Sequence, residues 1–425
     1  MKKILHIGLL LLATTILSAQ GIEKAETGTF LLKNGQVYTH DNGMIGADLL
    51  IKDGMITQVG NDITATDAKV IDCEGLEIYP GMIDSGTKLG IAEVGAVSLT
   101  QDHNEHGDFT PHMQALTAVN PNSVNIPVNR VNGVTTVLTV PSGNLFPGTA
   151  AAIDLHGYTP NQMYAGFKAV VLNFPSSGRR GRFDRRSDED IKKASSKRMK
   201  KLDKFWKSSK IYAGIKAKNG NTDYNPQMDA LLPAFNDGAP VLLEVNKKED
   251  ILKAIEWVTK NKVKAIFTGV SEGYRVIDSL KKYDIPVITG PILNNPARSS
   301  DKYDVGYTNA GLMSKGGIKV AIRTNETENV RNLPYNAGFA AAYGMGWEEA
   351  FKAVTQTAAD IFGIGDKYGS LEKNKVANLF ISDGDPFETK TQIKHLFIRG
   401  WKISMDSRHT LLYDEFLERD PGITK

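Results

Sequence analysis

Several residue types and patterns are scarce in this chain of 425 residues, and each absence excludes a class of structure or function. The single cysteine, Cys73, excludes an internal disulfide and a zinc site built from thiolates. The formal net charge is only +3, which gives no general attraction to nucleic acid or to a membrane surface. The G-x-S-x-G pattern of a serine hydrolase is also missing. The composition, 41% hydrophobic and 23% charged, is that of a globular protein with room for one large and one smaller domain.

The start of the chain has the pattern of an export signal. Lys2 and Lys3 precede a mostly apolar run over residues 4–17, and small residues follow at 18 and 19. This pattern predicts a cleaved signal peptide over residues 1–19, because the apolar run is too short for a stable membrane span. A buried N-terminal helix is the alternative. With cleavage we expect a periplasmic or secreted protein of a bacterial envelope, with no membrane span in its mature chain.

Both ends of the mature chain have β texture. Residues 28–79 alternate short apolar runs with turns such as Asn34-Gly35 and Asp53-Gly54, which are strong hairpin signals. Residues 364–412 show the same texture, with apolar runs on either side of the Asp383-Gly384-Asp385-Pro386 turn. We therefore expect one β-sandwich domain composed of both chain ends.

The middle of the chain, residues 80–363, alternates short apolar strands with helical stretches. The expected strands are 82–84, 135–140, 169–172, 241–245, 264–268, 286–288 and 320–323. Strand–helix alternation over nearly three hundred residues favours a parallel α/β fold, and this length is typical of a (β/α)8 TIM-like barrel.

A basic stretch interrupts the barrel pattern at residues 179–210, which contain fourteen Lys and Arg residues and five acidic residues. Its apolar residues between Ile191 and Lys207 have helical spacing, which predicts an amphipathic helical excursion with a solvated basic face. A docking surface for a partner or an anionic polymer is the alternative. No aromatic residues interleave as in single-strand binders, so we expect no nucleic-acid partner.

Four segments carry patterns specific enough to compare with a known family. They are P-G-M-I-D at 80–84, N-G-V-T-T-V at 132–137, S-E-G-Y at 271–274, and G-S-L-E-K-N-K-V-A-N-L with D-G-D-P at 369–386. They resemble the P-G-x-I-D, G-V-T-T-V, T-E-G-Y, G-S-L-E-P-G-K-D-A-D-L and D-G-D-P motifs of the amidohydrolase superfamily, especially its imidazolonepropionase-like branch. The resemblance covers residues 29–408 and implies the same barrel with a composite β domain.

The same resemblance implies a metal site in the barrel. Members of the family use a divalent metal such as zinc, which makes hydroxide from water and polarises the scissile carbonyl. Its ligand and proton-shuttle positions correspond here to Gly86, Lys88, Glu244, Asn246, Gly269 and Asn325. Glycine has no ligand atom, a lysine cation repels a metal, and an asparagine amide is no general base. We therefore predict that the metal site is lost and that no cofactor is bound.

Three further residues are weaker site candidates. Lys168 could match a family lysine near the fourth strand, and packing or surface charge is its simpler role. His103 and His106 lie in a D-H-N-E-H segment with metal-like spacing, for which a loop of solvated or hydrogen-bonded histidines is the simpler interpretation. At the barrel mouth itself we expect Lys88 and Glu244 to form a salt bridge that replaces the charge of a lost metal.

Three functional hypotheses follow from these residues. The leading one is a non-catalytic, structural or regulatory amidohydrolase homologue, which forms a homo-oligomer or a hetero-oligomer with an active relative. The second is a hydrolase of C–N bonds, in a cyclic amide or peptide-like substrate, with a divergent site. The third is a protein that binds a small molecule in the retained pocket.

Overall fold

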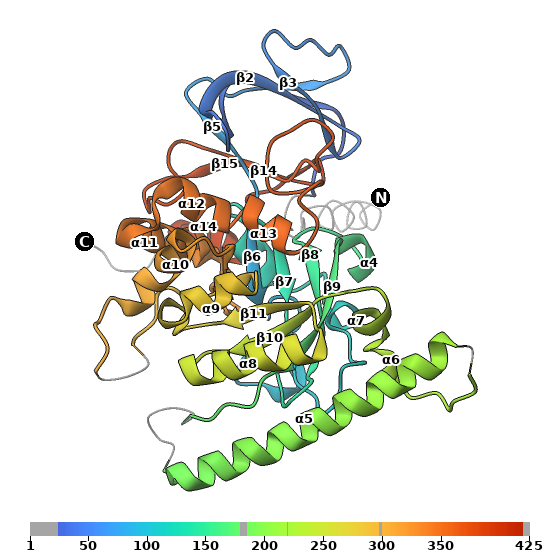
Figure 1. Ribbon diagram of the computed structural model, residues 1–425. Helices are drawn as coiled ribbons and strands as arrows, with labels where there is room; N and C mark the ends of the chain where they lie inside the picture. Colours follow the sequence, from blue (N-terminus) through green and yellow to red (C-terminus); the bar gives the residue numbers. More distant parts are fainter. Residues whose placement is uncertain (1–23, 179–184, 219, 297–299, 420–425) are drawn as a thin grey trace, which may run out of the picture.

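The computed structural model describes residues 24–178, 185–218, 220–296 and 300–419. The predicted signal peptide, residues 1–19, and the start of the basic stretch, 179–184, lie outside these ranges. The chain folds into a β domain and a larger α/β barrel, which occupy the top and the centre of Figure 1. The expected α/β barrel fold with a separate β domain is therefore confirmed.

The β domain is one mixed sheet built from both chain ends. Its strand order is β16-β15-β14-β5-β1-β2-β3, and β4 pairs with β1 in parallel. Phe30 from the N-terminal part packs edge-on against Phe397 from the C-terminal part, with 5.2 Å between ring centroids. The strands are β1 (Phe30–Thr39), β2 (Gly43–Lys52), β3 (Met55–Gly60), β4 (Lys69–Asp72), β5 (Glu77–Pro80), β14 (Leu379–Ser382), β15 (Ile393–Ile398) and β16 (Trp401–Ile403).

The barrel is an eight-stranded sheet in which neighbours in sequence are neighbours in space. The strands are short and buried, as expected for a sheet covered by helices. They are β6 (Met82–Thr87), β7 (Val134–Thr139), β8 (Gly148–Asp154), β9 (Tyr164–Asn173), β10 (Val241–Val245), β11 (Ala265–Gly269), β12 (Val287–Thr289) and β13 (Val320–Ile322).

Strand β8 departs from the regular βα repeat, because it runs antiparallel to both β7 and β9. The connections before and after it, residues 140–147 and 155–163, are shorter than the dozen or more residues that a parallel crossover needs. The sequence pattern missed β8, since its alanine-rich core (Ala150, Ala151, Ala152) carries no strong strand signal.

Helices surround the barrel, and short helical turns connect the strands. The longer helices are α5 (Asp188–Ala217), α8 (Lys248–Asn261), α10 (Val305–Lys315), α11 (Leu333–Ala340), α12 (Trp347–Ala353) and α14 (Arg408–Glu418). The shorter ones are η1 (Ser98–Thr100), α2 (Ala115–Ala118), α3 (Asn125–Arg130), α4 (Pro160–Met163), α6 (Pro226–Asp229), α7 (Leu232–Asn236), η2 (Gly273–Arg275), α9 (Ile277–Lys282), η3 (Val330–Asn332), η4 (Ala341–Met345) and α13 (Gln356–Ile361). Among the described residues, no helix is long and apolar enough to cross a membrane.

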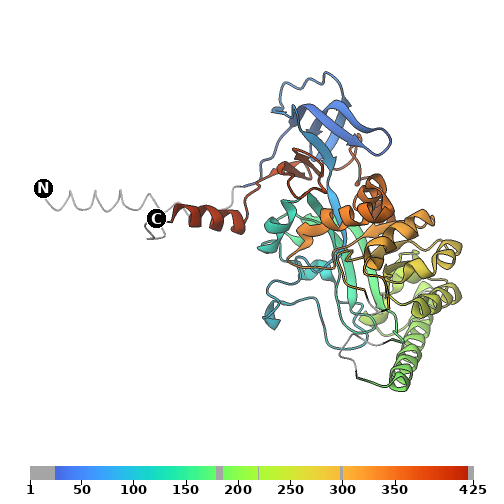
Figure 2. The same ribbon diagram turned by 90° about the vertical axis from the view of Figure 1, so that its left-hand side faces the viewer.

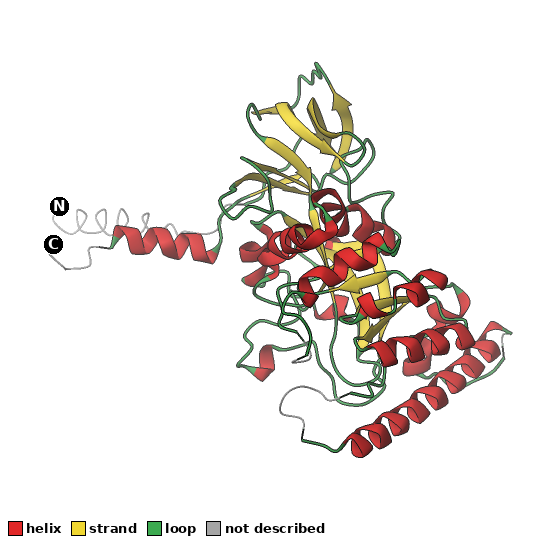
Figure 3. Ribbon diagram, turned by 60° about the vertical axis from the view of Figure 1, so that its left-hand side comes forward, coloured by secondary structure: helices red, strands yellow, loops and turns green. Residues whose placement is uncertain are grey.

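The basic stretch forms helix α5, which lies along the edge of the barrel farthest from the β domain (Figure 1). Ser187 caps it by accepting a hydrogen bond from the Asp190 N–H, and three acids in its first turn complement the helix dipole. Its inner face buries Leu202, Phe205 and Trp206 against the barrel. Helix α14 at the other end of the chain projects away from the body (Figures 2 and 3).

Candidate functional site at the barrel mouth

The carboxyl ends of the parallel strands form the barrel mouth, on the side away from the β domain. A cavity of about 300 Å³ opens there between the ends of β10, β11, β12 and β13. Four of the positions nominated from the sequence line it together: Glu244, Asn246, Gly269 and Asn325. This is the end of a TIM-type barrel at which active sites form.

An ion pair between Arg323 and Glu244 occupies the centre of this mouth. Arg323 lies directly after β13, and its Nη1 and Nη2 donate to Oε2 and Oε1 of Glu244 over 2.8 and 3.0 Å. The Thr268 hydroxyl donates to Oε2 over 2.6 Å, and the Asn246 amide donates to Oε1 over 3.1 Å. Both carboxylate oxygens of Glu244 are therefore held by two donors each.

These partners fix the charge of Glu244. Burial by itself raises the pKa of this carboxyl, but the Arg323 charge and the hydrogen bonds outweigh it and lower the pKa to about 2. The Arg323 side chain is only 9% exposed, so the pair is well shielded from water on that side. Glu244 is consequently ionised at neutral pH and has no free oxygen with which to accept a proton.

Two glycines give this ion pair its space. A Cβ at Gly86 would lie 2.8 Å from Cδ of Arg323, which crosses over that position. A Cβ at Gly269 would lie 2.6 Å from Oε1 of Glu244 and 2.5 Å from Oδ1 of Asn246, and its φ of +84° is strained for other residues. A larger residue at either glycine position would collide with the ion pair as it stands.

The expected salt bridge between Lys88 and Glu244 is not formed. Glu244 pairs with Arg323 instead. The physical reason is geometry: a guanidinium offers two parallel donors to both carboxylate oxygens, which an ammonium cannot do. The sequence did hold a signal for Arg323, a lone charge at the carboxyl end of an apolar barrel strand.

A fully buried carboxyl, Asp84, closes the barrel seam between β6 and β13. It accepts the Gly86 N–H over 3.0 Å, the Thr324 N–H over 3.1 Å and the Thr324 hydroxyl. The Asn325 N–H also donates to the Gly86 carbonyl over 2.9 Å. Complete burial raises the pKa of Asp84 to about 7, although these hydrogen bonds and the Arg323 charge act in the opposite direction.

The protein-family comparison identifies the chain on the basis of its barrel and C-terminal strands. The model of the amidohydrolase family matches residues 129–402. The chain belongs to the amidohydrolase family.

Individual relatives of this amidohydrolase-family protein are distant. Amidohydrolase tasK of Hapsidospora irregularis is 22% identical over 412 residues and 83% of this chain, which spans 39% of the length of tasK. A dihydroorotase of Bacillus thuringiensis (strain Al Hakam) is 42% identical, but over only 55 residues and 13% of each chain.

Solved structures extend the likeness to nearly the whole chain. An amidohydrolase from Thermotoga maritima MSB8 has a TM-score of 0.75 at 22% identity and matches over 88% of this chain and 99% of its own. Molinate hydrolase has a TM-score of 0.57 at 16% identity and matches over 94% and 99%. At such identities the likeness shows the fold alone.

The mouth of this amidohydrolase-family protein does not fit a divalent metal. Gly86 and Gly269 have no donor atom, and both Glu244 oxygens are bound by Arg323 and its neighbours. The Arg323 guanidinium itself is a fixed cation in the same space. Among the described residues, no group of three or more His, Cys, Asp or Glu side chains is placed to hold a metal.

The weaker candidates lie away from the mouth cavity. His103 Nδ1 hydrogen-bonds the Ser142 hydroxyl over 2.7 Å, and His106 is exposed to solvent. Burial lowers the pKa of His103, and the nearby Lys88 charge lowers it further. Lys168 lies in β9, where its ammonium donates to Gln114 over 3.2 Å. The structure therefore does not bring these three residues together with Glu244.

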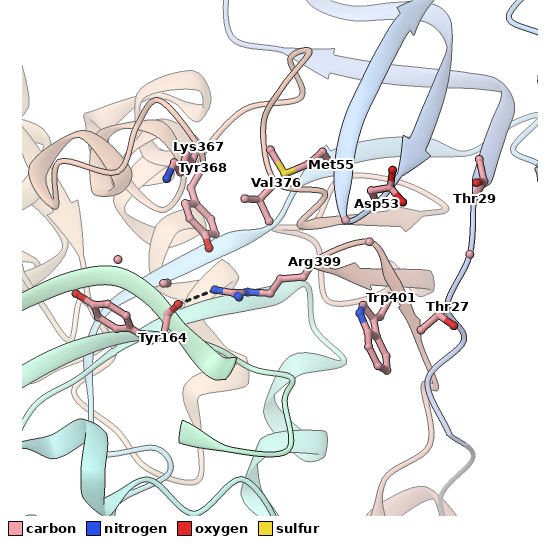
Figure 4. Close-up of a pocket in the computed structure, with 15 residues that line it drawn as sticks. Thr27, Thr29, Asp53, Met55, Tyr164, Lys367, Tyr368, Val376, Arg399 and Trp401 are labelled. Carbon is pink, nitrogen blue, oxygen red and sulfur yellow. Dashed lines mark hydrogen bonds between the residues drawn. The ribbon is translucent and has the colours of Figure 1, made fainter. Parts of the chain in front are cut away.

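A larger cavity, of about 700 Å³, lies at the opposite end of the barrel, where the β domain meets it (Figure 4). Arg399 reaches into this junction from the β15–β16 turn, and its Nη2 donates to the Tyr164 carbonyl over 2.6 Å. Its Nε donates to the fully buried Asp154 of β8 over 2.5 Å, and Asp154 also accepts from Tyr368 and Asn378. This network ties the two domains together.

Proposed function

We propose that this amidohydrolase-family protein is a non-catalytic homologue in which an Arg323–Glu244 ion pair replaces a metal centre. The bidentate contact of these two side chains inside the barrel mouth is the observation that carries the proposal. A guanidinium supplies one fixed positive charge but has no open coordination position at which water could be ionised. In this proposal the mouth retains a fixed positive charge but no group that ionises water for hydrolysis.

The neighbouring residues support the same proposal. Asn325 stands at the family's proton-shuttle position, and its amide cannot exchange a proton with substrate at neutral pH. The divergent-site hypothesis takes Glu244 as its candidate base, but this carboxylate has a pKa near 2 and donors on both oxygens. The state of Glu244 therefore favours the non-catalytic hypothesis over the C–N hydrolase hypothesis.

The setting in which such a homologue acts follows from the sequence. The signal pattern of residues 1–19 supports export to a periplasm or beyond, and the quoted motifs support the imidazolonepropionase-like branch. We propose a structural or regulatory role, as a homo-oligomer or as a subunit beside an active family member. Co-purification with a catalytically active amidohydrolase from the native host tests the subunit version, and recovery of this chain alone would count against it.

Metal content is the direct test of the non-catalytic proposal. The mature protein would be incubated with zinc and with manganese, passed over a desalting column and measured by elemental analysis beside a metal-containing family member. We expect far less than one metal per chain. About one metal per chain that disappears in an E244Q variant would overturn the proposal, because Glu244 would then be a ligand rather than a salt-bridge partner.

The mouth cavity gives a second candidate function some support. Its lining is rich in hydrogen-bonding side chains, among them Asn246, Ser271, Tyr274 and Asn294, and its volume suits a small polar molecule. A binding protein that retains this pocket is therefore the second candidate. A thermal-shift screen against cyclic amides and dipeptides tests it: a hit must lose its shift in an N246L variant, and the absence of any hit would leave the structural role.

A further inference from the structure

Helix α5 carries a straight row of lysines on its outer face. Successive helix residues turn by about 100°, so positions spaced alternately by four and three residues fall within roughly 40° of one line. Five lysines have this spacing and extend over about 21 Å of helix. They are Lys193, Lys197, Lys200, Lys204 and Lys207, here called the lysine row.

The row is exposed and mostly without counter-charges. All five side chains are solvent-exposed. Lys193 pairs with Glu189 one turn away over 3.0 Å. The other four make no ion pair with any carboxylate in the described part of the chain. Lys201, which lies off the row, is the contrasting case, because it pairs with Asp108 on the barrel.

Such an arrangement is unfavourable for the helix by itself. Like charges three and four residues apart repel one another, and the row contains four such neighbouring pairs. Helix packing does not require lysine at these positions, since the buried contacts come from the opposite face through Leu202, Phe205 and Trp206. Neutral polar residues would serve the fold as well, so the positive charge points to a partner.

We propose that the lysine row is a docking surface for a bilayer that contains anionic lipid. The five positive charges favour a negatively charged partner, and their straight arrangement along the helix suits a flat surface. The row lies on the outer face of α5, opposite its buried residues, and α5 runs along the lower edge of the molecule in Figures 1 and 3.

The residues that continue the row agree with a lipid surface. Ile211 lies eighteen residues beyond Lys193, which is five helical turns, and therefore on the same line. Its side chain is 56% exposed, and that of Ile215, one turn further, is 39% exposed. Aliphatic side chains beside a basic row can enter the headgroup layer while the ammonium groups contact lipid phosphates.

The test is vesicle sedimentation of the whole mature protein. Vesicles of phosphatidylcholine alone are compared with equimolar phosphatidylcholine and phosphatidylglycerol, at low and high salt. We expect binding to the anionic vesicles only, and loss of that binding at high salt because the contact is electrostatic. No binding to anionic vesicles, or equal binding to both kinds, would overturn the proposal.

Two variants, each lacking five positive charges, distinguish the effect of the lysine row on vesicle binding from the effect of net charge. In the first, the five lysines of the row become glutamine, which keeps good helix propensity. In the matched control, glutamine replaces five exposed lysines from other elements: Lys253, Lys302, Lys319, Lys373 and Lys390. We expect at least about tenfold weaker vesicle binding in the row variant and a much smaller effect in the control.

Three controls keep the result interpretable. Circular dichroism and melting temperature must match the wild type, and single Lys200→Gln and Lys204→Gln variants, with partial effects, replace the fivefold variant if it misfolds. Equal weakening in the row and control variants would overturn the proposal, because net charge alone would explain binding. Binding of soluble polyphosphate without binding of anionic vesicles would also overturn it, in favour of a polymeric ligand.

Discussion

Arg323 and Glu244, seventy-nine residues apart in the chain, face each other across the barrel mouth with two parallel hydrogen bonds of 2.8 and 3.0 Å. The aliphatic part of the Arg323 side chain passes over Gly86, and the Glu244 carboxylate passes over Gly269. Gly86, Glu244 and Gly269 stand at positions that the family resemblance assigns to a metal site, and Arg323 lies beside them. The two glycines leave the space that the ion pair fills. This relationship underlies the first two predictions.

Breaking the ion pair on one side should destabilise the fold. In Glu244→Ala the Arg323 guanidinium stays buried without its partner, and we expect a loss of about 3 kcal/mol in the free energy of unfolding. The double variant Glu244→Leu with Arg323→Met removes both charges and should recover most of that loss. Urea denaturation of Glu244→Leu, Arg323→Met and the double variant measures the coupling, and additive losses would contradict a direct pair.

We expect any side chain at position 86 to compete with Arg323 for space. Gly86→Ala should cost about 1–3 kcal/mol in the free energy of unfolding, because the new methyl group meets Cδ of Arg323. In an Arg323→Ser background this penalty should disappear. Gly214→Ala is the control: this glycine lies exposed within α5 with open space around its Cβ position, so we expect stabilisation by about 1 kcal/mol.

Asp84 should make stability fall as pH rises toward neutrality. Its pKa is about 7 in the fold and near 3.8 when unfolded, so between these values the native state holds the additional proton. Raising the pH through this window therefore lowers the free energy of unfolding, by at most about 4 kcal/mol. Glu244 acts in the opposite direction at lower pH, because its lowered pKa adds stability as the pH rises from about 2 to 4.5, the usual pKa of a glutamate.

Asp84→Asn isolates this effect. The amide oxygen can accept the N–H groups of Gly86 and Thr324, and the amide nitrogen can donate to the Thr324 hydroxyl, so the geometry is retained. We expect the variant to gain stability relative to the wild type from pH 5 to about pH 7, and the gain to level off above that pH. Melting temperatures across that range measure it, and parallel curves for the two proteins would mean that Asp84 does not titrate there.

The Arg399–Asp154 pair should couple the two domains. Asp154 is fully buried, so Arg399→Met leaves an unpaired carboxylate at the junction, and we expect a loss of about 3–5 kcal/mol in the free energy of unfolding. Calorimetry should also show two transitions in place of one. Lys394→Met, which breaks an exposed pair with Asp383, is the control and should change stability by less than about 1 kcal/mol.

Local patterns in the chain were enough to predict the general architecture. Hairpin signals at both chain ends and strand–helix alternation between them predicted a barrel with a separate β domain, because burial imposes its own periodicity on each type of element. The motifs also pointed to Glu244, Asn246, Gly269 and Asn325, which line the mouth cavity together. These features are local, and the residues that express them are close together in the chain.

Which side chains meet depends on how distant parts of the chain pack together. Arg323 rather than Lys88 pairs with Glu244, β8 runs against its neighbours, and Asp84 closes the seam with a raised pKa. Each of these outcomes depends on contacts between residues far apart in the chain, on the reach of a guanidinium, or on burial from several sides at once. None of these quantities is expressed in the periodicity of a single segment.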